Sequence, residues 1–338
     1  MLSLKCAIEI KCKNSKKTVK FDYCNDILIK TSCKNLTDTA VVKVPRKMQW
    51  QGKDLTNFVN IDDEISIQMG YAEMGNIETV FKGYIKNIEN ATPIIISCEN
   101  EMRLFKTVNV DAEIIEHFNL KTWLKKYVPE LQIELPDDVN FGKVKIEQQT
   151  LAQALDKLMS TYPWLKGFFR EGVFYGITTH KALANGRILT FNPERNQISD
   201  SLKYTTKEDV KIAVKATSIQ NDNSKIEVIV PREAVQTTTT TETVKSDYEQ
   251  RQFYFPGISS KQELKDAAEK LLNDYTCDKM TGSITAFGIP YVRKGDIVRL
   301  QDKIRKERDG RKFWVDAVEY KFGTSGYRQT ITLGYEIK

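Results

Sequence analysis

The side chains that could act as a general base near neutral pH are the two histidines, His117 and His180, which lie in separate segments of this 338-residue chain. A hydrolase of the Ser-His-Asp type needs a G-x-S-x-G turn that exposes its nucleophile. The nearest match, Gly323–Tyr327 (GTSGY), lacks the final glycine and predicts a turn between two strands. The sequence has no glycine-rich phosphate loop and no H-E-x-x-H zinc motif. We therefore expect neither enzymatic activity nor a bound cofactor.

Acidic side chains could form a glycosidase-like pair or a metal site, and the chain has 45 of them. The tightest cluster is Asp62-Asp63-Glu64, directly ahead of an alternating apolar stretch. A short acidic run before a strand is typical of a turn, whereas glycosidase carboxylates face each other across a substrate. We interpret the cluster as a turn. The rival interpretation, a cell-wall hydrolase, would depend on specific carboxylates.

Cysteines could bind zinc, and four of the six (Cys6, Cys12, Cys24 and Cys33) lie close together in the sequence. Their spacings fit no zinc-finger pattern, and no C-x-x-C pair occurs. From Leu4 to Cys12 every second residue is apolar, which places Cys6 and Cys12 on the inner face of a half-buried strand. We interpret the cysteines as small apolar side chains of a protein folded in a reducing cytoplasm, with no bound metal.

The net charge of +6 is modest, and basic residues alternate with acidic ones almost everywhere. The densest basic run, Lys303–Lys312, predicts a solvated hairpin tip that closes at Asp309-Gly310. No aromatic residues are interspersed in this run to stack on bases, so a nucleic-acid surface is the weaker interpretation. No run of 18 apolar residues and no signal-peptide pattern is present, so we expect no membrane span.

The first hundred residues read as short strands separated by turns, which favours a sandwich or small barrel. The expected strands are Leu4–Cys12, Asp26–Cys33, Thr39–Val44, Glu64–Tyr71, Thr79–Glu89 and Pro93–Glu99. Between about 101 and 200 the pattern becomes mixed. Leu120, Trp123, Leu124 and Tyr127 share one helical face, and Thr150–Gln153 is a capping box that opens a second helix. A hairpin over Trp164–Ile177, turning at Glu171-Gly172, is expected to pack on that helix.

After residue 200 the pattern returns to strands, with a turn predicted at Asn221–Ser224 and a mobile loop or extended arm at Thr237–Thr241. A third helix is expected from a capping box at Ser260–Glu263 to Tyr275. The last expected strands are Gly282–Phe287, Ile297–Leu300, Phe313–Phe322 and Arg328–Tyr335. The chain thus divides into a β-barrel-like domain (1–105), a small α/β module (106–200) and a second β-barrel-like domain (201–338), a mainly β fold.

The order of these features resembles the late control protein D family of phage tail hubs and the N-terminal part of type VI secretion spike proteins. One block of motif residues is Gly70-Tyr71, then Phe81 and Gly83, then a strand that ends at the acidic Glu99. The second block is Lys294–Leu300, in which Gly295, Val298 and Leu300 match the family's glycine-led strand. The chain departs from the family by having Lys294, in place of a common proline, before Gly295, and by its polythreonine segment.

The resemblance implies a non-enzymatic tail or baseplate hub with two barrel-like domains of tail-hub type. Three copies would form a ring of pseudo-sixfold symmetry that joins a hexameric tail tube to a trimeric spike. DNA or other cargo would pass through the lumen without sequence-specific binding. Assembly would take place in the cytoplasm of a bacterial host, and the subunit would reside in the tail of a virion or injection particle.

A glycan- or peptidoglycan-binding tail module is the alternative function, because it would also be rich in β-structure and lack catalytic motifs. Such a module would use exposed aromatic rings as a platform, and Trp50 and Trp164 are the candidates.

Overall fold

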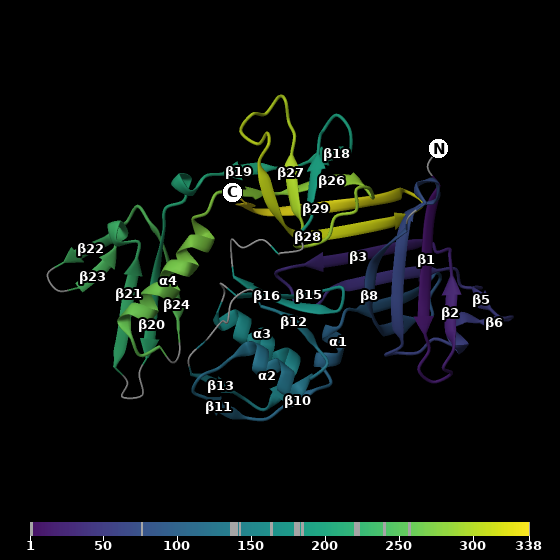
Figure 1. Ribbon diagram of the computed structural model, residues 1–338, viewed down its shortest axis with the longest axis horizontal. Coiled ribbons are helices and arrows are strands. Elements are labelled where there is room, and N and C mark those ends of the chain that lie inside the picture. Colours follow the sequence, from purple (N-terminus) through teal and green to yellow (C-terminus); the bar gives the residue numbers. More distant parts are fainter. Residues whose placement is uncertain are drawn as a thin grey trace.

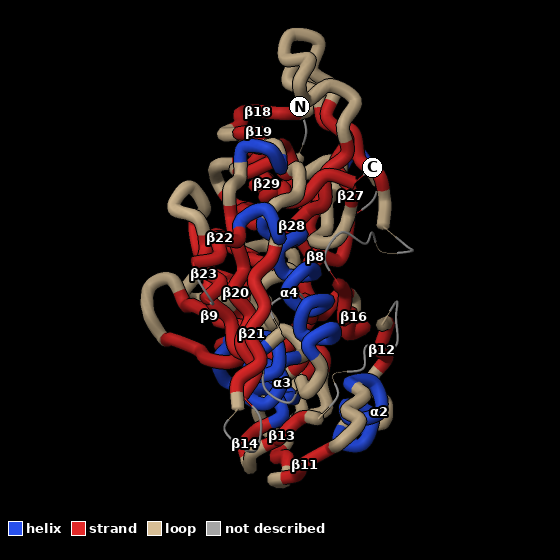
Figure 2. The backbone as a smooth tube through the Cα atoms, turned by 90° about the vertical axis from the view of Figure 1, so that its left-hand side faces the viewer, coloured by secondary structure: helices blue, strands red, loops and turns tan. Residues whose placement is uncertain are grey.

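The computed structural model describes residues 3–75, 77–135, 141, 143–162, 165–178, 183, 186–219, 224–238, 241–255 and 258–337. Its chain is mainly strand with four α-helices, and Figure 1 shows strands from both ends of the chain side by side near the centre of the molecule. The mainly β fold with a small α/β module is thereby confirmed. Figure 2 shows α4 (Lys261–Tyr275) near the centre of the molecule and α2 (Leu120–Tyr127) and α3 (Leu151–Thr161) in its lower part, with strands between and around them.

The strands of the first hundred residues follow the alternation of the sequence closely. In β1 (Leu4–Lys11) the inward residues Cys6, Ile8 and Ile10 are buried, and the residues between them are half-buried or exposed. The other strands here are β2 (Thr18–Phe21), β3 (Asp26–Ser32), β4 (Thr39–Val44), β5 (Gln49–Trp50), β6 (Lys53–Asp54), β7 (Glu64–Tyr71), β8 (Ile77–Glu89) and β9 (Ile94–Glu99). Two 3-10 turns, η1 (Leu55–Asn57) and η2 (Ala72–Met74), separate them.

One continuous sheet joins the two β-rich ends of the chain. β28 (Lys312–Gly323) pairs antiparallel with β29 (Gly326–Ile337) on one side and with β3 on the other, where Tyr320 faces Ile29. The strand order along the sheet is β18-β26-β29-β28-β3-β4-β9-β8-β7-β1-β2. The remaining strands of this region are β17 (Ile188–Phe191), β18 (Gln197–Asp200), β19 (Lys203–Thr205), β25 (Lys279–Thr281), β26 (Ser283–Phe287) and β27 (Ile297–Leu300).

The barrel-like parts predicted from the sequence are not strictly closed, because the described strands form an open sheet. β3, which would close a barrel within the first block, instead pairs with β28 of the last block. A single apolar core follows from this pairing and takes in Ile8 and Ile67 from one end and Phe313 and Ile331 from the other. The predicted domain boundaries at residues 105 and 200 stay predictions.

The middle segment forms the α/β module with its own core. α2 (Leu120–Tyr127) buries Leu120, Trp123 and Leu124, as their spacing predicts. α3 (Leu151–Thr161) begins at the expected capping box, with both reciprocal hydrogen bonds between Thr150 and Gln153. The other elements are α1 (Met102–Phe105), β10 (Asn109–Val110), β11 (Glu113–Ile115), β12 (Gln132–Glu134), β13 (Val144–Ile146), β14 (Gln149–Thr150), β15 (Leu165–Arg170) and β16 (Val173–Thr178). β15 and β16 are the predicted hairpin, and Leu165, Phe169 and Phe174 join the core that α3 covers.

A third core lies where α4 (Lys261–Tyr275) packs on a three-stranded sheet of order β21-β20-β24. These strands are β20 (Ile212–Ile219), β21 (Lys225–Val230) and β24 (Glu249–Tyr254), with the 3-10 turns η3 (Lys207–Asp209) and η4 (Arg232–Ala234) beside them. Ser260 is the N-cap residue of α4, but in the described structure its side chain forms no capping hydrogen bond, so the predicted capping box is wrong.

The threonine-rich segment, predicted as a mobile loop or an extended arm, contains two paired strands. β22 (Val235–Thr238) and β23 (Thr241–Val244) pair as an antiparallel hairpin at one extremity of the molecule (Figure 1). Thr239 and Thr240 of this segment, and Asn221–Asn223 of the predicted turn before β21, lie outside the described residues. None of the described helices is long and apolar enough to cross a membrane.

Candidate functional site

The first block of motif residues lies on β7 and β8, in the interior of the sheet. Gly70 faces Lys5 of β1, and the buried Tyr71 donates a hydrogen bond from its hydroxyl to the carbonyl of Tyr327, at 3.1 Å. Phe81 is buried opposite Ile67. Gly83 passes so close to β9 that a Cβ at this position would lie 2.1 Å from the carbonyl oxygen of Glu99. Only glycine fits there, and this residue sets the separation of β8 from the end of β9.

The second block lies on β27 and the turn before it. Gly295 has φ +79°, a conformation that favours glycine, and its amide donates to the carbonyl of Val315 at 2.9 Å. Val298 is buried opposite Phe313. Leu300 is buried as well. Its amide donates to the carbonyl of Arg311 and its carbonyl accepts from the amide of Gly310, so these two hydrogen bonds join the ends of the following loop. Both blocks contribute to one core, since Phe81, Val298 and Leu300 belong to the same apolar cluster.

Lys294, the departure from the family pattern, forms a buried ion pair across the fold. Its ammonium lies 2.6 Å from a carboxylate oxygen of Asp38, and both side chains are less than a tenth exposed. The ammonium also donates to the carbonyl of Ser32 at 3.2 Å and lies 5.3 Å from the ring centre of Phe168. Burial raises the pKa of Asp38, and the attraction of Lys294 opposes that rise. Lys294 thus contacts the first β block and the α/β module from the start of β27.

Asp296 is a second buried charge two residues further along. Its two carboxylate oxygens accept hydrogen bonds from Arg170 of β15 and from Arg187, each at 2.9 Å, and a third from the amide of Arg293. The Asp296 side chain is fully buried and that of Arg170 nearly so. Because a buried charge is costly unless it is paired, this cluster fastens the α/β module to the sheet in one register. The sequence did not indicate that Asp38, Arg170 and Asp296 are buried, because charged residue types are usually exposed and only the fold shows their burial.

Glu99, the acidic residue that ends the motif strand, is held in a comparable way. Its carboxylate contacts the ammonium groups of Lys86 at 2.7 Å and Lys106 at 2.6 Å. Burial alone would raise the pKa of Glu99, but the hydrogen bonds and charges of the two ammonium groups outweigh this effect. The pKa of Glu99 therefore lies below its ordinary value. Lys106 follows α1, so Glu99 connects the last strand of the first block to the module.

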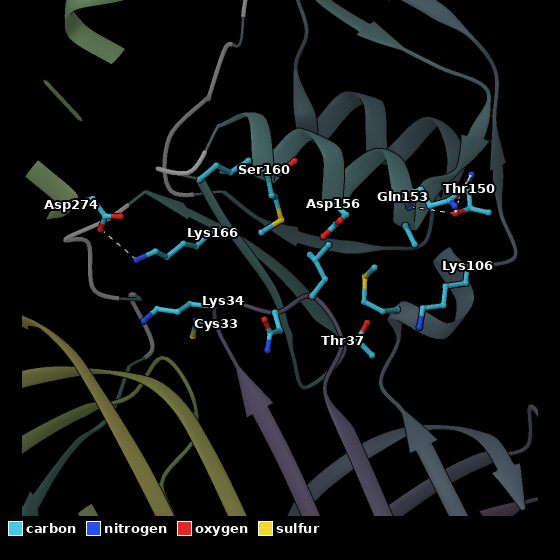
Figure 3. Close-up of a pocket in the computed structure, with 16 residues that line it drawn as sticks. Cys33, Lys34, Thr37, Lys106, Thr150, Gln153, Asp156, Ser160, Lys166 and Asp274 are labelled. Atoms are coloured by element: carbon cyan, nitrogen blue, oxygen red, sulfur yellow. Dashed lines mark hydrogen bonds and ion pairs between the residues drawn. The ribbon is translucent and has the colours of Figure 1, made fainter. Parts of the chain in front are cut away.

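A groove of about 1080 Å³ lies where the three parts of the chain meet (Figure 3). One wall is the connection from Cys33 to Thr37, between β3 and β4; the other is α3, from which Asp156 and Ser160 extend. Its closed end holds Lys166 of β15 beside Asp274 of α4, 3.6 Å apart. Leu36, Met102, Met159 and Leu165 supply apolar surface. The groove is large enough for a segment of polypeptide.

The groove has no nucleophile–base pair among its described residues. Cys33 is fully buried, and burial raises the pKa of its thiol to about 12, so the thiolate that would react is scarce at neutral pH. The hydroxyl of Ser160 donates to the backbone carbonyl of Lys157 at 2.9 Å. Lys34 is paired with the buried Asp316 at 2.6 Å. Ser160 and Lys34 are thus already engaged by neighbouring groups.

The acidic cluster at Asp62-Asp63-Glu64 has structural partners. Asp63 accepts hydrogen bonds from the amides of Lys13 and Asn60, each at 2.8 Å. Asp62, at φ +68°, accepts from Arg103, and Glu64 pairs with Lys11 across the strands. The cluster is therefore the predicted turn. Among the described residues no group of three or more histidine, cysteine or acidic side chains could hold a metal ion.

Of the aromatic and histidine candidates, the structure describes Trp50 and His117, and neither lines this groove. Trp50 is half-buried and packs edge-on against Phe58, with ring centres 4.9 Å apart. His117 precedes the buried Phe118 in the module. Trp164 and His180 lie outside the described residues.

The basic run Lys303–Lys312 forms the loop between β27 and β28. Asp302 accepts hydrogen bonds from the amides of Ile304 and Arg305, and the buried Arg308 pairs with both Asp302 and Asp200. The loop closes at Gly310, with φ +74°, where the chain was predicted to turn. Lys303, Arg305 and Lys306 are exposed around it, as expected for a solvated tip.

Comparison with solved structures places this fold. The chain matches the tail protein from Neisseria meningitidis with a TM-score of 0.64 at 12% identity, over 97% of this chain and 96% of that one. It matches the 43 kDa tail protein of prophage MuSo2 from Shewanella oneidensis with a TM-score of 0.65 at 12% identity, over 98% of both chains. This is the fold of phage tail proteins.

The tail-protein fold also extends to secretion machinery. The chain matches the Francisella PdpA-VgrG complex with a TM-score of 0.57 at 10% identity, over 100% of this chain and 53% of that one. The resemblance to phage tail proteins and type VI spike proteins is thus confirmed for the fold. No family model matches the sequence, and no curated protein matches it. Membership of the late control protein D family stays a prediction.

Proposed function

We propose that this chain is a structural subunit of a phage tail or phage-like injection particle, and that it is the hub between a hexameric tail tube and a trimeric spike. The observation that carries the proposal is the match of the whole chain to tail proteins. The alignment leaves no large part of either chain uncovered. The likeness to a complex that contains VgrG supports a spike as one partner, and the tail tube is proposed as the other.

The interior of the chain supports a structural role. Two buried ion pairs, Lys294–Asp38 and Arg170–Asp296, connect segments that lie far apart in the sequence, and the partly exposed Lys106 pairs with the buried Glu99. Such contacts fix the orientation of the parts, which a ring subunit needs in order to present matching surfaces to its neighbours. We propose that the chain is not an enzyme, and that cargo passes its lumen without sequence-specific contacts.

The proposed hub is a homotrimer that assembles in the host cytoplasm and resides in the finished tail. Light scattering behind size exclusion tests this directly, and the expected mass is three times 38.9 kDa. The same experiment is repeated after mixing with the tube and spike proteins of the same particle. A chain that stays monomeric at every concentration, and gains no mass with either partner, would refute the hub.

A further inference from the structure

Two of the six cysteines lie next to each other although they are 18 positions apart. The sulfur of Cys6 lies 3.9 Å from that of Cys24. The other cysteines have different neighbours. Cys33 contacts the carbonyl of Val315 and Cys277 that of Asp274, while Cys12 and Cys98 are buried in the main core. Cys6 and Cys24 therefore have each other as neighbours, whereas the other four cysteines contact other groups.

The two members of the pair differ in accessibility. Cys6 is buried on the inner face of β1, and its thiol donates to the carbonyl of Asp22 at 3.2 Å. Cys24 is half-buried in the short connection between β2 and β3, where its neighbours Tyr23 and Asn25 are exposed. A small reagent can thus reach Cys24 from the surface, with Cys6 directly behind it.

We propose that Cys6 and Cys24 form a site of oxidative modification, at which a disulfide bond closes when the protein meets a low-molecular-weight disulfide. A disulfide needs its sulfurs about 2 Å apart, so the pair must approach by roughly 2 Å. The connection from Phe21 to Asp26 lies at the surface and can supply this movement without displacing β1 from the sheet. The site does not depend on the proposed hub function.

The reaction balances as two successive exchanges. The thiolate of Cys24 attacks one sulfur of the reagent, forms a mixed disulfide and releases the first small thiol. The thiolate of Cys6 then attacks the Cys24 sulfur, and the second small thiol leaves. The two cysteines lose two protons and two electrons, and the reagent gains both. Before the reaction, the hydrogen bond between the two thiols lowers the pKa of Cys6 and raises that of Cys24, so the attack by Cys24 is expected to be the slower exchange.

The bond would connect β1 to the β2–β3 connection and close a short loop of the chain. Closing a loop restricts the unfolded chain more than the folded one, so the oxidised protein is the more stable form. A particle that leaves a reducing cytoplasm would acquire this stabilisation outside the cell.

The test is incubation of the purified full-length chain with glutathione disulfide, with dithiothreitol treatment as the reduced reference. We expect the oxidised chain to lose the mass of two hydrogen atoms and to yield a non-reduced peptide that joins Cys6 to Cys24. Its thermal midpoint should rise by about 5 °C and return on reduction. Cys24→Ser should abolish all three changes, whereas Cys98→Ser, at a buried cysteine, should retain them.

Three results would overturn the proposal. They are an unchanged thiol count, a stable glutathione adduct at Cys24 that never resolves, and a disulfide that joins any other pair of cysteines. The peptide map separates these outcomes, because lysines between Cys6 and Cys24 allow trypsin to place the two cysteines on different fragments.

Discussion

Replacing Lys294 with methionine tests the reasoning about buried charge most directly. Methionine has a similar length and can occupy the space beside Phe168, so the change removes the charge and little volume. Asp38 would keep its hydrogen bond from the amide of Ser32, at 3.0 Å, but would lose the ammonium of Lys294, which lies 2.6 Å from its carboxylate.

The expected cost follows from the burial of the pair. Both side chains are less than a tenth exposed, so water cannot replace the lost ammonium. Removing one partner of such a pair typically costs about 3–5 kcal/mol. The double variant Asp38→Leu/Lys294→Met removes both charges and should recover most of that loss. A matched control is Lys321→Met, because the Lys321–Glu319 pair is exposed and should contribute less than about 1 kcal/mol.

The loss at Lys294 should also depend on pH. Burial raises the pKa of Asp38 above its ordinary value of 3.8, so the folded state binds this proton more tightly than the unfolded state. The free energy of unfolding is then highest below the unfolded-state pKa and falls as the pH rises through the folded-state pKa. Without Lys294 the folded-state pKa rises further. The deficit of the variant should therefore be small near about pH 4 and complete near about pH 7.

Urea unfolding followed by circular dichroism at both pH values is the assay, on wild type, both single variants, the double variant and Lys321→Met. The reasoning is refuted if Lys294→Met costs no more than Lys321→Met at neutral pH. It is also refuted if the double variant is as unstable as Lys294→Met alone, since the cost would then not come from an unpaired Asp38.

Three other positions give sharp expectations. Gly83→Val places a side chain against the Glu99 carbonyl, so we expect insoluble or unfolded protein by size exclusion and circular dichroism; a folded variant that still assembles would contradict this, and Lys82→Val, at the exposed neighbouring position on β8, is the control. Tyr71→Phe removes the hydrogen bond to Tyr327 and should cost about 1 kcal/mol in urea unfolding, so an unchanged midpoint would argue against that bond. Cys33, whose pKa is raised to about 12, should not react with a thiol reagent near about pH 8 until the chain is denatured, and rapid labelling of the native protein would show that it is accessible.

Local patterns predicted the single elements well. β4, β7 and β27 occupy the predicted ranges, and α2 follows from one helical face of apolar residues. The exceptions are instructive. Ser260 begins a sequence that fits a capping box, but its side chain makes no such bond in the described structure, because the motif permits the contact without requiring it.

Long-range pairing was beyond the reach of local patterns. Nothing in the alternation of Asp26–Ser32 indicates that its partner is β28, almost three hundred residues later, so the sequence indicated barrel-like domains but not the open sheet that joins them. The buried charges were missed for a related reason. Lys294 and Asp38 have the types of surface residues, and only the completed fold removes them from water. Lys294 did stand out as a departure from the family pattern, which was the one available signal.

The pairing of β3 with β28 has a consequence for how the protein is made. A ribosome releases the first hundred residues long before β28 exists, so the edge of β3 waits without its permanent neighbour during most of synthesis. An open strand edge is a template for the wrong partner, and pairings between distant segments form slowly. Premature termination anywhere before Lys312 would leave that edge exposed for good. We expect such fragments to aggregate or be degraded, which would limit the access of incomplete subunits to an assembling particle.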